Sequence, residues 1–166
     1  LIHLLFNMIG LHVFGREVEA IYGNIRFLII FLFSIIIAGI TSYNFSSGIA
    51  IGASGGLFGI LGALMYFFYK EKKEIVGAEM RFKSMYTLLI INIVLGFVIP
   101  NIDNSAHFGG LISGSILAFI LVPKYEIISS PGSLRIQKNK KQTFEAIGLL
   151  LYIAFTFLLF YKTIVK

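Results

Sequence analysis

Six apolar segments constrain the fold of this chain more than any other feature. They cover residues 1–14, 27–43, 52–69, 85–99, 106–122 and 144–161. Most are close to the roughly 17 to 25 residues that an α-helix needs to cross a bilayer. Charged residues make up only 13% of the chain, against about 25% in soluble domains. The sequence therefore predicts an all-α, polytopic transmembrane helix bundle with about six spans.

The basic residues are concentrated on one side of these predicted spans. Of the 14 Lys and Arg residues, 12 follow the first, third and fifth spans. These are Arg16, Arg26, Lys70, Lys72, Lys73, Arg81, Lys83, Lys124, Arg135, Lys138, Lys140 and Lys141. By the positive-inside rule this side is cytoplasmic. The net charge of +6 is thus a topology signal that also suits an anionic lipid surface, and nucleic acid is not an expected partner.

Polar segments are predicted to connect the spans. We expect a charged turn over residues 15–26, a polar loop over 44–51, a charged loop over 70–83 and a tight turn over 100–105. In the first of these, Glu17 and Glu19 are expected to pair with Arg16 or Arg26.

The chain is expected to divide into three parts. These are an apolar core over residues 1–123, a basic cytoplasmic linker over 124–143 and an additional transmembrane helix over 144–166. The linker contains Pro131 and Gly132 and is not expected to pack. Because residue 1 is a Leu within an apolar run, we expect the chain to be a fragment that lacks its natural N-terminus.

Four polar side chains share one predicted depth in the membrane. The first, third and fifth spans all run from outside to inside under the predicted orientation. His3 and Asn7 lie at the outer end of the first, Ser54 at that of the third and His107 at that of the fifth. Ionisable residues within a span are costly and are by default functional candidates. The alternative for each is local: a serine that bonds back to a carbonyl, a neutral buried histidine, or a polar contact between helices.

Small residues could bring two of these groups together. One stripe of four-residue spacing follows Ser54 and another accompanies His107. The first contains Gly55, Gly59 and Ala63, and the second Ala106, Gly110, Gly114 and Ala118. Such stripes let helix backbones approach closely in lipid, and docking them would set His107 against Ser54. The glycines beside Ser54 also clear space around its hydroxyl, and the helix start supplies unpaired N–H groups where an oxyanion would form.

Other chemistry is less consistent with the sequence. The chain has no cysteine, and its three histidines are not spaced as metal ligands, so neither a metal nor another cofactor is expected. The spans hold no pair of acids for an aspartyl protease. Residues 52–56 lack the lysine of a phosphate-binding loop. A transporter would show interrupted helices or buried charges near the midplane.

The polar and glycine motifs together resemble those of the rhomboid intramembrane serine proteases. The matching pieces are His3-Leu-Leu-Phe-Asn7, the Gly15, Glu19 and Gly23 turn, Gly52-Ala-Ser54-Gly55, and Asp103-Asn-Ser-Ala-His107-Phe-Gly-Gly110 with Gly114. They cover residues 1 to 122 in the family's order and spacing. The chain would then hold five of the six core helices and one further C-terminal helix, since the family's first helix and long outer loop are absent from it.

This resemblance implies an activity and a role for each site residue. Ser54 would be the nucleophile and His107 the general base and then acid, with no acidic third member. The Ser54 backbone N–H and the side chains of His3 and Asn7 would hold the oxyanion. Family members cleave transmembrane helices of other proteins near the outer face, often beside small residues. Some members carry a Tyr one turn after the nucleophile; the equivalent Phe58 here can still stack on the histidine.

Two other functions stay open at this stage. A catalytically inactive rhomboid-like protein would bind transmembrane helices without cutting them. A transporter or channel would leave the alignment of the four polar residues to chance. The Ile-, Lys- and Asn-rich composition favours an AT-rich bacterial genome and a plasma membrane, and oligomeric state is not readable.

Overall fold

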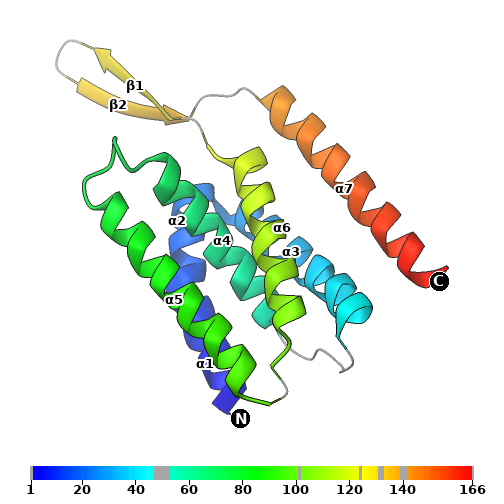
Figure 1. Ribbon diagram of the computed structural model, residues 1–166. Helices are drawn as coiled ribbons and strands as arrows, with labels where there is room; N and C mark the ends of the chain where they lie inside the picture. The colour runs from blue at the N-terminus through cyan, green and yellow to red at the C-terminus, as the bar shows by residue number, and fades with distance from the viewer. Residues whose placement is uncertain are drawn as a thin grey trace.

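The residues that the structure describes form six helical rods and one small hairpin (Figure 1). The computed structural model describes residues 2–46, 53–100, 102–123, 125–130, 133–138 and 142–165. In these residues the elements are α1 (Ile2–Gly10), a π-helical turn (Leu11–Gly15), α2 (Arg16–Tyr22), α3 (Asn24–Phe45), α4 (Ser54–Lys70), α5 (Ala78–Val98), α6 (Asn104–Leu121), β1 (Tyr125–Ser130), β2 (Ser133–Lys138) and α7 (Gln142–Ile164). Because α1, the π-helical turn and α2 follow one another without a break, they form one continuous helical rod. The predicted fold class, a bundle of helices, is confirmed.

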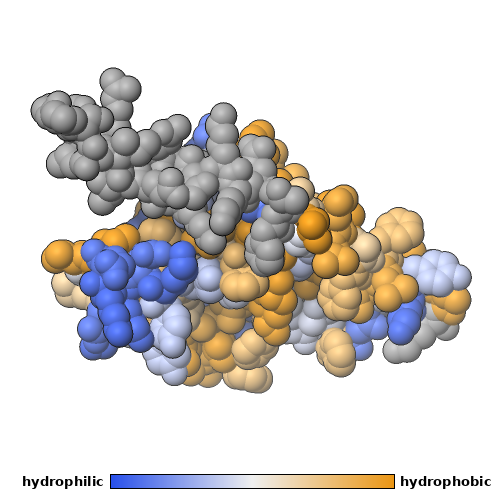
Figure 2. Space-filling model, turned by 90° about the horizontal axis from the view of Figure 1, so that it is seen from above, coloured by the Kyte–Doolittle hydropathy of each residue, from blue (hydrophilic) through white to orange (hydrophobic). Residues whose placement is uncertain are grey.

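Four of the rods have the length and apolar composition of membrane spans. Among the described residues, four helical segments are long and apolar enough to cross a bilayer: Asn24–Phe45, Ala78–Val98, Asn104–Leu121 and Glu145–Ile164. Large apolar side chains face outward, such as Phe97 at 76% exposure and Phe157 at 72%. Figure 2 shows hydrophobic side chains over much of the coloured part of the visible face, with hydrophilic ones gathered in separate patches. Such a surface is stable in lipid and not in water.

The predicted charged turn over residues 15–26 is wrong in its position. Gly15 and Arg16 have helical backbone angles, and the helix continues through the charged residues to Tyr22. The break falls at Gly23, whose φ of +87° suits glycine and few other residues. Arg and Glu are good helix formers, so their charge marks the membrane boundary and not the end of the helix.

The expected pairing of the acids in this segment is also wrong for Glu17, which pairs with Arg81 of α5. Arg26 pairs with Glu145 of α7. Both ion pairs link helices that are distant in the sequence, and such partners leave no local signal.

Other helix ends shift by a few residues from the prediction. Helix α5 begins at Ala78, seven residues before the expected Met85, after Gly77 adopts a φ of +83°. Helix α6 begins at Asn104 within the expected tight turn, because Asp103 caps it. The predicted loop over 44–51 lies mostly outside the described residues, and α3 extends to Phe45.

The linker contains a hairpin that the sequence analysis did not predict. Strands β1 and β2 pair antiparallel, from Tyr125 opposite Lys138 to Ser130 opposite Ser133. Pro131 and Gly132, between the strands, lie outside the described residues. A Pro-Gly pair marks a turn, and the runs on both sides of it contain Ile, but the prediction of an unpacked linker did not consider that these runs could pair.

Helix α4 lies at the centre of the bundle. It packs against α3, α5, α6 and the α1–α2 rod. Its residues Ile60, Ala63 and Leu64 are fully buried, as is Leu117 of α6. The start of this central helix therefore lies among its neighbours, which is where the candidate nucleophile occurs.

Candidate active site

Helices α4 and α6 are in backbone contact along their glycine stripes. A methyl group added to Gly110 would overlap the carbonyl oxygen of Gly55, and one added to Gly114 would overlap that of Gly59. From the first contact to the second, the contacting residue moves four positions toward the C-terminus on each helix, from Gly55 to Gly59 and from Gly110 to Gly114. The two helices therefore run parallel and in register. The glycines singled out from the sequence thus lie at the closest approach of these two helices.

Ser54 is the first residue of α4 and is partly exposed. The Leu57 N–H donates to the Ala53 carbonyl at 3.0 Å, which closes the first helical turn. The N–H groups at the start of a helix lack intrahelical partners, so the backbone beside Ser54 presents donors where an oxyanion would form. Gly52, which precedes this turn, lies outside the described residues.

His107 is held over the first turn of α4 by Phe58. The two rings stack with centroids 3.9 Å apart and planes only 9° from parallel. Phe58 is 7% exposed and His107 8%. The stacking predicted for Phe58 is therefore confirmed. Because Phe58 follows Ser54 by four residues, both project from the same side of α4.

The α6 backbone also lies beside the start of α4. A Cβ on Gly55 would be 3.7 Å from the carbonyl oxygen of Ala106, the residue before His107. Ser54 and His107 therefore occupy adjacent positions on two helices in contact. This arrangement can support a nucleophile and a base.

The α1–α2 rod brings Asn7 to the same level. A Cβ on Gly10 would be 3.3 Å from a Leu57 methyl group, and farther along the rod the Tyr22 hydroxyl donates to the Ala63 carbonyl at 3.3 Å. The rod and α4 thus run in the same direction. Asn7 precedes Gly10 by three residues and Ser54 precedes Leu57 by three, so they lie at one depth. His3 lies one turn beyond Asn7 on α1, and its side chain is outside the described residues.

Asp103 is a site-supporting residue whose part in the site the sequence analysis did not predict. Its Oδ1 accepts a hydrogen bond from the Ala106 N–H at 3.0 Å, and its Oδ2 accepts one from the Ser42 hydroxyl of α3. Its carbonyl accepts from the His107 N–H at 3.2 Å. An Asp three residues before the helical Ala106 is a typical N-cap signal. The bond to Ser42, by contrast, had no signal in the sequence.

The described residues contain no group of three or more His, Cys, Asp or Glu that could hold a metal ion.

Comparison with known proteins connects this site to a family. A family model described as the Rhomboid domain matches residues 1–124. The chain is 42% identical over 126 residues to the Rhomboid protease GluP of Bacillus subtilis, covering 74% of this chain and 24% of that protein. It is 32% identical over 126 residues to the Rhomboid protease GlpG of Haemophilus influenzae, covering 72% and 62%.

A plant relative extends the match beyond the core. RHOMBOID-like protein 5 of Arabidopsis thaliana is 30% identical over 156 residues, covering 88% of this chain and 50% of that protein. The chain thus spans less than two thirds of the length of each of these three relatives.

Proposed function

Because the chain belongs to the rhomboid family, and is therefore an integral, multi-pass membrane protein, we propose that it is an intramembrane serine endopeptidase with a Ser54–His107 dyad. The observation that carries this proposal is the stacking of His107 on Phe58, one turn after Ser54, across the glycine contact of α4 and α6. A dyad needs nucleophile and base fixed on rigid elements, and two helices in backbone contact supply this.

The proposed reaction is acyl transfer followed by hydrolysis. The Ser54 oxygen attacks the carbonyl carbon of the scissile peptide while the His107 imidazole takes the hydroxyl proton. The peptide C–N bond then breaks, and His107 gives this proton to the leaving amine. A water molecule, deprotonated by His107, cleaves the acyl–Ser54 ester and restores the hydroxyl.

The negative oxygen of each tetrahedral intermediate needs donors. The Ser54 N–H supplies one, and the side chains of Asn7 and His3 supply others in this proposal. The shared depth of Asn7 and Ser54 supports the first of these two side chains. For His3 the support is its place one turn away on α1.

The proposed substrates are transmembrane helices of other proteins, cut near the outer face. The distribution of Lys and Arg supports an outer position for the Ser54 end of α4, since the positive-inside rule puts the basic loops in the cytoplasm. A bacterial plasma membrane is the proposed location, in keeping with the Bacillus subtilis relative. Lipid and the substrate helix are then the partners.

The test is labelling by a fluorophosphonate probe, which reacts with activated serines. The protein, expressed from its complete coding region, is reconstituted in liposomes beside Ser54→Ala and His107→Ala variants. Ser84→Ala is the matched control, because this hydroxyl is exposed on α5 and bonds to the Met80 carbonyl. We expect labelling of the wild type and the control only, and a decline at low pH as the imidazole is protonated.

A folded wild-type protein that stays unlabelled would overturn the proposal. The catalytically inactive relative that binds transmembrane helices would then be the better assignment. Thermal unfolding of each variant distinguishes loss of chemistry from loss of fold.

A further inference from the structure

Helix α7 lies outside the residues matched by the Rhomboid family model, and the structure gives it a role. It packs against α3 and α6 of the core. Four of its polar side chains, Glu145, Tyr152, Thr156 and Thr163, are spaced by 7, 4 and 7 residues. At about 100° per residue they fall within about 20° of one line along the helix. A polar stripe on an otherwise lipid-facing helix marks the face that contacts other helices.

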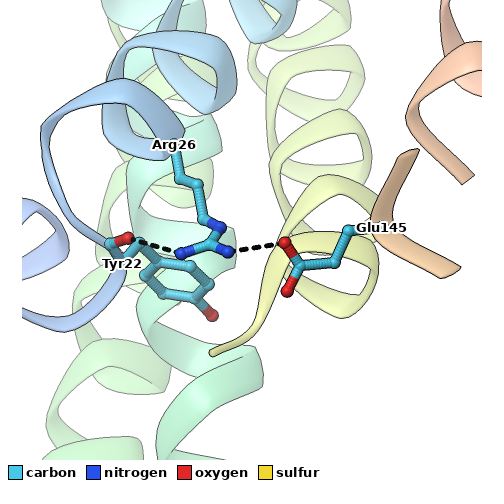
Figure 3. Close-up of polar contacts among 3 residues, drawn as sticks. All are labelled: Tyr22, Arg26 and Glu145. Carbon is cyan, nitrogen blue, oxygen red and sulfur yellow. Dashed lines mark hydrogen bonds and ion pairs between the residues drawn. The ribbon is translucent and has the colours of Figure 1, made fainter. Parts of the chain in front are cut away.

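The first contact is an ion pair at the start of α7. Figure 3 shows the Arg26 guanidinium between the Tyr22 carbonyl and the Glu145 carboxylate. The distance to the Glu145 oxygen is 2.5 Å, and that to the Tyr22 carbonyl is 3.4 Å. The two charged side chains are only 20% and 21% exposed. Arg26 therefore joins α7 to the junction of α2 and α3.

The second contact lies in the middle of α7 and reaches the core. The Tyr152 and Ser113 hydroxyl oxygens are 2.5 Å apart, and the Ser34 hydroxyl donates to Ser113 at 3.3 Å. Ser34, Ser113 and Tyr152 are 0%, 1% and 6% exposed. The ring of Phe33 also meets the Tyr152 ring edge to face, with centroids 5.9 Å apart. A buried chain of three hydroxyls thus joins α7, α6 and α3.

The third contact fixes the far end of α7. The Asn44 amide donates to the Thr163 hydroxyl at 3.1 Å. Glu145, Tyr152 and Thr163 are thus each bonded to α3 or α6. Such contacts at three heights define the rotation and height of α7 on the core.

The hydroxyl chain ends where α3, α4 and α6 meet. A methyl group on Gly59 would overlap the Ser34 side chain and would be 3.2 Å from the Gly110 carbonyl oxygen. Gly59 follows Ser54 by five residues, or about 7.5 Å along the helix, and Ser113 follows His107 by six, or about 9 Å. A change at Tyr152 can therefore alter the distance between α4 and α6, because Tyr152 contacts Ser113, Ser113 contacts Ser34, and Ser34 lies against Gly59.

We propose that α7 is a brace for the catalytic core and that Tyr152 is a positioning residue for the Ser54–His107 pair, acting through Ser113 and Ser34. The positioning role rests on the proposed function, whereas the docking of α7 does not. Without the Tyr152 hydroxyl, Ser113 loses one of its two partners in a buried site, and the α6 segment that carries His107 is less tightly fixed.

The positioning role is tested with Tyr152→Phe, which removes only the hydroxyl. Tyr161→Phe is the matched control, since Tyr161 lies on the opposite side of α7 and is 58% exposed. The rate of fluorophosphonate labelling is measured as a function of probe concentration. This gives two quantities, the maximal rate constant and the probe concentration at which the rate is half-maximal. We expect Tyr152→Phe to lower the maximal rate constant about fivefold, the rate equivalent of one hydrogen bond, with the half-maximal concentration unchanged.

An unchanged rate constant in Tyr152→Phe would overturn the positioning role, even if the variant unfolds at a lower temperature. A second measurement uses reversal of charge. Arg26→Glu should detach the start of α7 and lower the unfolding temperature, and adding Glu145→Arg should restore it. Failure of the double variant to recover would overturn the ion pair as a docking contact.

The packing of α7 against the core is tested by cross-linking, which does not depend on catalytic activity. The chain has no cysteine, so Asn44→Cys with Thr163→Cys forms one defined pair. A protease site placed between residues 131 and 132 allows the linker to be cut after oxidation. We expect α7 to stay covalently attached for this pair and to be released for Asn44→Cys with Tyr161→Cys. Release in both pairs would overturn the brace, and an unlabelled protein that still cross-links would overturn only the dyad.

Discussion

Asp103→Ala is the substitution whose cost can be worked out most directly from the structure. The change removes the acceptor of the Ala106 N–H at the start of α6 and the acceptor of the Ser42 hydroxyl. Loss of an N-cap costs about 1 kcal/mol. Ser42 is 3% exposed. A buried hydroxyl that is left without a hydrogen-bond partner lowers the free energy of unfolding by about 1–3 kcal/mol. Because Ser42 can turn back to a carbonyl of its own helix, we expect a total of about 2–3 kcal/mol.

The assay is reversible unfolding in mixed micelles, with the free energy of unfolding compared among variants. Asp103→Asn keeps an oxygen for the cap and should lose less than Asp103→Ala. Ser42→Ala removes the hydroxyl, so no buried group then needs Asp103 as its acceptor. In the Ser42→Ala background, the loss in free energy of unfolding caused by Asp103→Ala should therefore be about 1 kcal/mol smaller than in the wild type. Labelling of Ser54 should fall with Asp103→Ala, since the cap sets the first turn that carries His107. A loss below about 0.5 kcal/mol, the range of ordinary surface substitutions, would refute this reasoning.

Two further substitutions test the contact between α4 and α6. Gly110→Leu would drive a side chain into the Gly55 carbonyl, which is backbone and cannot turn away, so we expect loss of folded protein in a thermal unfolding assay. Gly39→Leu is the control, because a Cβ there meets nothing within 4 Å, and equal stability of the two variants would contradict the contact. Phe58→Ala removes the ring stacked on His107 and should slow fluorophosphonate labelling about fivefold, since an aromatic pair is worth about 1 kcal/mol. Phe58→Tyr keeps the ring and should label within about twofold of wild type, and equal rates for both variants would count against stacking as the device that holds the imidazole.

The extent of the helices was predictable where burial in lipid decides it, and less so at their ends. Apolar length located all six rods, because a bilayer leaves the backbone few alternatives to a helix. The ends differ because charged residues next to the apolar segments are also helical: Arg16 and Glu17 in α2, and Glu79 and Arg81 in α5. Charge marked the edge of the membrane, while positive φ at Gly23 and Gly77 marks where the chain turns.

The candidate site was predictable as far as local spacing reaches. The glycines beside Ser54 and His107 indicated which helices would touch, and the stacking position of Phe58 followed from one helical turn. Ser42 and its bond to Asp103 left no such signal, because the two residues are 61 positions apart. The stripe of Glu145, Tyr152 and Thr163 was readable as one face of α7, but its partners on α3 and α6 were not.

Helix α6 combines a glycine contact with polar contacts to two other helices, and this has a physical reason. In lipid, apolar side chains gain little by moving from lipid to protein, so small residues and interhelical hydrogen bonds carry more of the specificity. Helix α6 has both: Gly110 lies against α4, Asp103 bonds to α3, and Ser113 bonds to α3 and α7. The helix that carries His107 is therefore tied to three neighbouring helices. In the proposed mechanism the general base must hold its place against a nucleophile on another helix to within a fraction of an ångström, and contacts from α6 to three neighbours are suited to that need.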